Sequence, residues 1–103
     1  MVKHIILWTL KPELSEAEKN AVKSGIKQGL ESLVGQIPGL LAATVHIDHR
    51  LPTSTCDVML DSTLESPEAL AAYAQHPAHV AVPNTRVRPF TAQRTCLDFE
   101  TEE

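Results

Sequence analysis

The segment Tyr73-Ala74-Gln75-His76-Pro77-Ala78-His79 gathers residues whose types and spacing suit acid–base chemistry. An imidazole titrates near neutral pH, so His79 can take a proton from an acidic carbon. The phenol of Tyr73 can donate to an oxygen on which negative charge develops. The segment therefore predicts general acid–base work on a carbonyl compound, with His79 as the base and Tyr73 as the donor.

The same histidines also have a structural interpretation. Pro77 biases His76 away from helical geometry, so a helix is expected to break there. His76 and His79 can then cap the broken helix by bonding to backbone groups. The sequence leaves both interpretations of His79 open, whereas His76 is better explained as part of the turn.

A metal site is a weaker alternative. His76 and His79 are three residues apart, and His4 can supply a third ligand, as zinc sites often require. His46 and His49 share this spacing, but in a strand their side chains would point to opposite faces. Because no cysteine or carboxylate cluster completes either set, we expect no metal, and no phosphate-binding loop or nucleophile motif indicates a cofactor.

Composition limits the class of protein. The 103 residues carry a net charge of −4 and nine scattered basic residues, which argues against a nucleic-acid partner. The early apolar run from Ile5 to Trp8 is too short for a membrane span or a signal peptide, so a cytoplasmic protein is expected. We expect one domain over residues 1–100 and a short acidic tail over 101–103. Cys56 and Cys96 are expected to be buried, reduced thiols.

Four strands and two main helices must position these groups. Residues rich in Val, Ile, Leu and Trp predict a first strand over 2–10, with His4, Ile6 and Trp8 on one face. Further strands are expected over 40–48, 56–63 and 91–99. The second helix is expected to run from Ser66 to Gln75, with a short helical piece ending at Pro83.

The first helix has the clearest signals. Ser15 and Glu18 form a capping-box pattern, and apolar residues then recur at helical spacing until Gly35 ends the helix. Gly25 and Gly29 fall inside the apolar arc. They either allow close packing, with Trp8 filling the space, or open a small cavity beside His4 and His79; we favour packing.

The order strand, helix, strand, strand, helix, strand is typical of an α+β, ferredoxin-like βαββαβ fold. It predicts a four-stranded antiparallel sheet with both helices on one face, and the first strand between the third and fourth. Cys56 and Cys96 would then lie roughly 9–10 Å apart, which is too far for a disulfide. The other face of the sheet is too apolar for water, so we expect a homodimer packed sheet on sheet.

Three segments together resemble the stress-responsive A/B barrel family, whose members are dimeric α+β barrels. They are Val2-Lys3-His4-Ile5-Ile6-Leu7-Trp8 with Leu10-Lys11-Pro12, then Ile37-Pro38-Gly39, then Tyr73-x-x-His76-Pro77-x-His79-Val80. The family includes a plant polyketide cyclase that makes olivetolic acid by an intramolecular aldol condensation without metal or cofactor. The resemblance matches its acid/base pair to His79 and Tyr73, and a pocket histidine to His4.

This resemblance implies a mainly apolar pocket between sheet and helices. We expect it to be lined by Ile6, Trp8, Val22, Ile26 and His76, and to hold a small apolar carbonyl compound. Residues 22–26 lack the aromatic residues of the cyclase pocket, which argues against the same substrate. The leading hypothesis is a cofactor-free cyclase or lyase, with His79, Tyr73 and His4 as catalytic residues. The alternatives are a non-catalytic, stress-associated or ligand-binding homodimer and, more weakly, a cofactor-independent monooxygenase.

Overall fold

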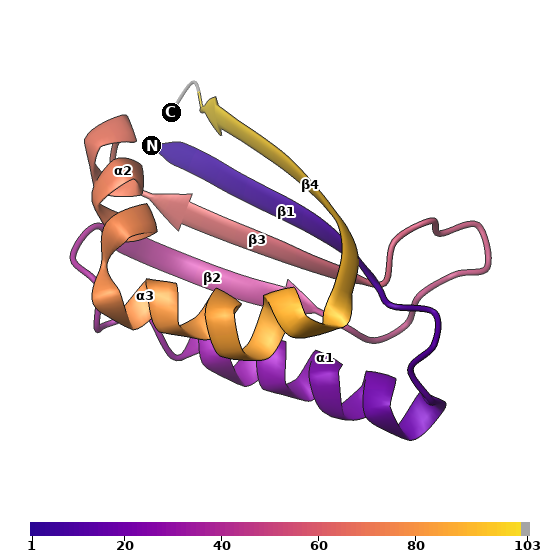
Figure 1. Cartoon of the computed structure of the whole chain (residues 1–103). Helices are drawn as coiled ribbons and strands as arrows, with labels where there is room; N and C mark the ends of the chain where they lie inside the picture. The colour runs from indigo at the N-terminus through magenta and orange to yellow at the C-terminus, as the bar shows by residue number, and fades with distance from the viewer. Residues whose placement is uncertain (102–103) are drawn as a thin grey trace.

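The computed structural model of the chain describes residues 1–101 and places the helices on one side of a four-stranded antiparallel sheet (Figure 1). The strand order is β2-β3-β1-β4, so the predicted ferredoxin-like arrangement is confirmed. The elements, in chain order, are β1 (Val2–Leu10), α1 (Glu16–Glu31), β2 (Leu40–His46), β3 (Val58–Leu64), α2 (Pro67–Gln75), α3 (Pro77–Val82), the π-helical turn η1 (Pro83–Val87), the 3-10 turn η2 (Arg88–Phe90) and β4 (Thr91–Glu100).

Strand β1 holds the centre of the sheet, paired with β3 on one side and β4 on the other. Its residues alternate strictly between buried and half-buried. The buried face contains His4, Ile6 and Trp8 and points toward the helices, as the period-two pattern predicts. This face is the floor from which a site between sheet and helices can be built.

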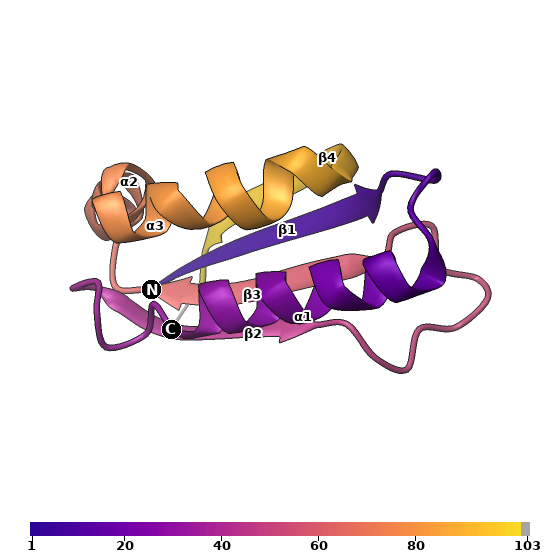
Figure 2. The ribbon, with the colours of Figure 1, turned by 60° about the horizontal axis from the view of Figure 1, so that its bottom comes forward.

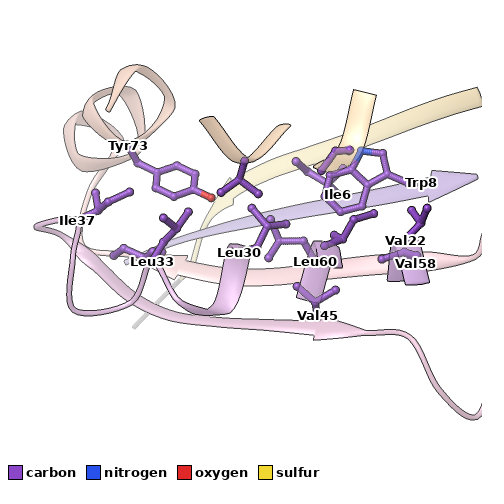
Figure 3. Close-up of a cluster of buried hydrophobic side chains, with 14 of the residues drawn as sticks. Ile6, Trp8, Val22, Leu30, Leu33, Ile37, Val45, Val58, Leu60 and Tyr73 are labelled. Atoms are coloured by element: carbon purple, nitrogen blue, oxygen red, sulfur yellow. The ribbon is translucent and has the colours of Figure 1, made fainter. Parts of the chain in front are cut away.

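Helix α1 begins with the predicted capping box. The Glu18 amide donates to the Ser15 hydroxyl, and the Ser15 amide donates to the Glu18 carboxylate. The helix then buries Val22, Ile26 and Leu30 against the sheet. Figure 3 shows Trp8 beside Val22 and Val58 at one end of this core, and Tyr73 reaching in from α2 at the other.

The helical segment after β3 breaks where the sequence predicts. Ser66 caps α2 by accepting from the Ala69 amide, and His76 adopts an extended conformation with φ −64° and ψ 131°. The short helix α3 ends at Val82, directly before Pro83 as expected, but the helical path then continues in a different form. Pro83 opens a π-helical turn in which the Arg88 amide donates to the Pro83 carbonyl. The wider turn tolerates a proline because the ring's missing N–H is not needed at its first position.

Figure 2 shows the helices from below, with α1 on one side and the α2–α3 segment on the other. The opposite face of the sheet has no helix across it. It presents half-buried Ile5, Leu7 and Met59, together with Leu97 at 62% exposure and Phe99 at 45%. We call these five side chains the open face. Lys3 and Asp61 form an ion pair of 2.5 Å beside them.

Several smaller expectations can be compared directly. Both cysteines are free, as predicted, but Cys96 is exposed and Cys56 only half-buried; the expectation of buried thiols was wrong because no helix covers β4. Residues 102–103 of the predicted tail lie outside the described residues, and the Thr101 amide donates to the Met1 carbonyl. No helix among residues 1–101 is long and apolar enough to cross a bilayer.

Candidate active site

A half-open cavity of about 560 Å³ lies between the sheet, the α2–η2 segment and β4. Its size is within the range of small-molecule sites. The buried part of the lining is mainly apolar apart from His4 and Tyr73, and we call it the inner wall; the exposed part, which includes Arg88, Gln93 and Arg94, forms the mouth. The lining residues are His4, Ile6, Trp8, Leu30, Leu60, Leu70, Tyr73, Ala74, His79, Pro83, Val87, Arg88, Thr91, Ala92, Gln93 and Arg94.

The structure brings His4, Tyr73 and His79 together in this cavity, with Ile6 and Trp8 beside them. It does not place the other expected lining residues there. Val22 and Ile26 are buried within the core on α1, and Leu30 is the α1 residue that reaches the cavity. His76 instead accepts a hydrogen bond at Nδ1 from the Ala78 amide, so it caps α3.

Tyr73 lies between the two histidines. Its ring centroid is 4.2 Å from that of His79 and 6.0 Å from that of His4. The residue is 1% exposed, and burial raises the pKa of its phenol to about 12. Tyr73 is therefore a neutral phenol at physiological pH, which makes it a hydrogen-bond donor and not a base.

The Tyr73 hydroxyl has no hydrogen-bond partner in the protein among residues 1–101. A buried phenol usually finds such a partner. Because Tyr73 lines the cavity, its O–H is available to an oxygen of a bound molecule. This availability suits the predicted role of donor to a carbonyl.

The tautomer of His79 follows from its backbone contact. Its Nδ1 lies 3.3 Å from the Ala74 carbonyl oxygen, and a carbonyl can only accept, so Nδ1 carries the hydrogen. Nε2 is then left with a lone pair. Burial lowers the pKa of His79 from 6.5, and the nearby Arg88 and Arg94 guanidinium groups lower it further, against an opposing effect of the Ala74 bond. His79 is neutral at pH 7 and can accept a proton at Nε2.

His4 is held by a residue that the sequence did not single out. The carboxylate of Asp98 contacts His4 Nδ1 directly. The contact exists because His4 on β1 and Asp98 on β4 are register partners in the sheet. The carboxylate accepts a hydrogen bond from the Nδ1–H of His4, which orients the ring. Nε2 of His4 is then free, like Nε2 of His79.

One group of side chains could also hold a metal ion. His4 Nδ1, Cys96 Sγ and an Asp98 oxygen lie within 4.8 Å of one another. This set differs from the His76, His79 and His4 set weighed above, because His76 turns away to cap α3. The direct contact of Asp98 with His4 Nδ1 already satisfies that nitrogen, so the geometry favours positioning of His4.

The prediction that Trp8 fills the space at the two helix glycines was wrong, although Gly29 does allow close packing against another element. A Cβ on Gly29 would meet Val82 Cγ1 and Arg86 Cδ, each at 2.9 Å, whereas one on Gly25 would meet nothing within 4 Å. The α3–η1 segment is thus the element that approaches α1. Trp8 forms part of the cavity wall and leaves the cavity open.

Asp98, Arg88 and Arg94 are the functional candidates that the sequence did not reveal. Asp98 and Arg94 become visible only through the β1–β4 register, which pairs them with His4 and Trp8. Alternation along the last strand would place both on one face, but nothing in the local sequence fixes which face. Arg88 is positioned by the π-helical turn, for which the sequence carries no clear signal.

The fold and this cavity define a class: a ferredoxin-like α+β protein with a histidine–tyrosine–histidine group between sheet and helices. A model of the stress responsive A/B barrel domain matches residues 2–101. The chain belongs to this family. Among the curated proteins, none matches the sequence.

Solved structures support the fold. A dimeric protein of unknown function with a ferredoxin-like fold, from Bacteroides fragilis, is 29% identical over 97% of this chain and 95% of its own, with a TM-score of 0.89. A hydroxynitrile lyase from Passiflora edulis is 16% identical, with a TM-score of 0.77 over 99% of this chain and 94% of its own. An antibiotic biosynthesis monooxygenase is also 16% identical, with a TM-score of 0.74 over the full length of both chains. At such identities the last two resemble this chain in fold alone.

Proposed function

We propose that this protein is a cofactor-free lyase or cyclase that acts on a small carbonyl compound. The observation that carries the proposal is the placement of Tyr73 between His79 and His4 on the wall of one cavity. Each of the three groups has the protonation state or free atom that its role requires. The apolar inner wall suits the hydrocarbon part of such a substrate.

The proposed roles follow from the hydrogen bonds. His79 takes a proton from the carbon next to the carbonyl, at the Nε2 that its bond to Ala74 leaves free. Tyr73 donates its O–H to the carbonyl oxygen, where negative charge collects as the carbon–hydrogen bond breaks. His4, oriented by Asp98, lies on the other side of Tyr73 and holds the substrate against it.

A non-catalytic ligand-binding protein is the second candidate. It is favoured by the backbone contacts of the histidines, since His76 caps α3 and His79 bonds the last turn of α2. In that case the histidines hold the helix break in place, and the cavity binds its ligand without turning it over.

The two functions differ in whether a bound ketone loses a proton. In deuterium oxide, we expect the wild-type protein to catalyse deuterium exchange of the protons next to the carbonyl of a 3-oxo ester. Proton NMR measures the rate of this exchange. Tyr73→Phe removes the hydroxyl, and His79→Gln removes the base. Each change should slow exchange by about 100-fold or more, while His49→Gln in an exposed loop should have no effect.

Exchange that persists in both Tyr73→Phe and His79→Gln would contradict the proposal. Binding of the ester without exchange by any of the four proteins would support the non-catalytic alternative. The circular dichroism spectrum of each variant controls for loss of fold.

We further propose that the chain forms a homodimer through the open face. The support is the apolar character of its five side chains on a face that no helix crosses. The Bacteroides fragilis protein, which is similar over nearly its whole length, is dimeric.

A further inference from the structure

The charge of the cavity lining differs in sign from that of the whole chain. Acidic residues outnumber basic ones 13 to nine. The residues that line the cavity nevertheless include Arg88, Arg94 and two histidines, and no aspartate or glutamate. The Asp98 carboxylate contacts His4 of this group directly. When the negative charge of Asp98 is counted, the two guanidinium groups still give the mouth of the cavity a net positive charge.

Both arginines are available to a ligand. Their side chains are exposed, at the mouth and not in the inner wall. Arg88 donates to the neutral Asn84 amide oxygen at 2.5 Å. Among residues 1–101, neither guanidinium lies within 4.0 Å of a carboxylate oxygen. Guanidinium groups are well suited to bind oxyanions through paired hydrogen bonds.

The arginines lie on two consecutive elements, and both line the cavity. Arg88 begins η2, and Arg94 is on β4 opposite Trp8. Both are close enough to His79 to influence its titration. A ligand with its carbonyl at Tyr73 and His79 therefore has its polar end within the field of both positive charges.

We propose that the cavity selects carbonyl compounds that carry a carboxylate, which Arg88 and Arg94 bind at the mouth. This inference rests on the proposed function, because it assumes that the carbonyl lies at Tyr73 and His79. The apolar inner wall takes the hydrocarbon chain, so the ligand is an oxo acid with an apolar tail. A phosphate would offer the same oxyanion chemistry to the arginines, and the experiment separates the two.

The test compares three probes of similar length: 3-oxooctanoate, its methyl ester, and octyl phosphate. Their dissociation constants are measured by NMR titration of the full chain at low ionic strength. We expect wild-type protein to bind the acid about tenfold more tightly than the ester. Added salt should weaken binding of the acid and not that of the ester.

Three variants locate the effect. Arg88→Gln and Arg94→Gln should each remove most of the preference for the acid, and the double variant should bind acid and ester equally. Arg50→Gln makes the same charge change in an exposed loop remote from the cavity lining and should keep the preference. Amide NMR spectra show whether each variant retains the fold.

Equal binding of acid and ester by the wild type, or a preference that survives the double variant, would overturn the proposal. Tighter binding of octyl phosphate than of the acid would overturn the choice of carboxylate, as would failure of all three probes to bind. Deuterium exchange of the bound acid is recorded in the same samples. It distinguishes failure of the proposed function from failure of this inference. Arginine-dependent binding without exchange supports this inference and contradicts the catalytic role.

Discussion

The bond between His79 and the Ala74 carbonyl serves two purposes at once. It ties α3 to the end of α2. It also fixes the hydrogen on Nδ1, so that Nε2 remains a hydrogen-bond or proton acceptor. A histidine can therefore be structural through one nitrogen and reactive through the other. The structural and catalytic interpretations of His79 do not exclude each other.

The lowered pKa of His79 predicts how stability depends on pH. Burial disfavours the charged ring in the folded state, so the unfolded chain binds a proton more readily, near its ordinary pKa of about 6.5. The free energy of unfolding should fall as the pH drops below 6.5, and level off below the folded-state pKa. Urea unfolding of wild type and His79→Gln, measured at several pH values between 5 and 8, checks this.

The quantity compared is the slope of the unfolding free energy against pH. The absolute free energy is not compared, because His79→Gln also removes packing against Tyr73. His49→Gln, in an exposed loop, should keep the wild-type slope. A slope that is equal in wild type and His79→Gln would show that His79 titrates normally in the folded protein.

At the residue scale, the sequence predicts three members of the candidate site and not the others. Tyr73 and His79 are recognisable because they are close in sequence around a proline break, and His4 because it lies on the buried face of a strand. Asp98, by contrast, is 94 residues from His4. Its role depends on strand register, which local sequence patterns do not encode.

At the scale of elements, the contact between α1 and the α3–η1 segment sets one wall of the cavity. Gly29 permits this contact, since any Cβ there would meet Val82 and Arg86. Arg86 also donates to the Gly25 carbonyl at 3.0 Å. The segment that presents His79 and leads into Arg88 is therefore held against α1 by side chains packed on the α1 backbone.

The two glycines should respond oppositely to the same substitution. Gly25→Ala gains helix propensity with no contact to disturb, so we expect stabilisation of about 0.5–1 kcal/mol. Gly29→Ala makes the same gain but overpacks against Val82, and a net loss of about 1 kcal/mol is expected. Urea unfolding at one fixed protein concentration measures both. Equal effects at the two positions would show that α3–η1 does not approach α1 as closely as described.

Element boundaries were predictable where local chemistry sets them. The capping box at Ser15, the Ser66-Pro67 start of α2 and the break before Pro77 are all written in short-range hydrogen bonding or proline geometry. The π-helical turn that begins at Pro83 was not predictable, because a proline ordinarily ends a helix and the packing of this segment on α1 involves residues far apart in the sequence. The expectation that Trp8 fills the space at Gly25 and Gly29 failed for the same reason.

For the whole molecule, the open face determines the expected assembly. Leu97 is 62% exposed on β4, and Leu51 is 67% exposed in the loop before β3. A substitution at Leu51 is therefore a matched control for the same substitution at Leu97. Leu97→Glu should convert a dimer to a monomer by placing a charge in an apolar interface, whereas Leu51→Glu should not. Sedimentation velocity at micromolar concentration measures the state of each protein.

A wild-type protein that sediments as a monomer would contradict the proposed homodimer. A dimer that survives Leu97→Glu would place the interface elsewhere. The fold itself was predictable at this scale because the order of the elements, together with right-handed connections, allows few topologies.

The pairing of β1 with β4 has a consequence for the order of folding. The cavity walls come from opposite ends of the described chain, and His4 meets Asp98 only when a 94-residue separation is closed. Closing so long a loop is entropically costly, and contacts of this range tend to form late. A chain in which β2, β3 and β1 have already associated with α1 would still lack this site. The ring signals of His4 therefore offer a local reporter of the moment at which folding is complete.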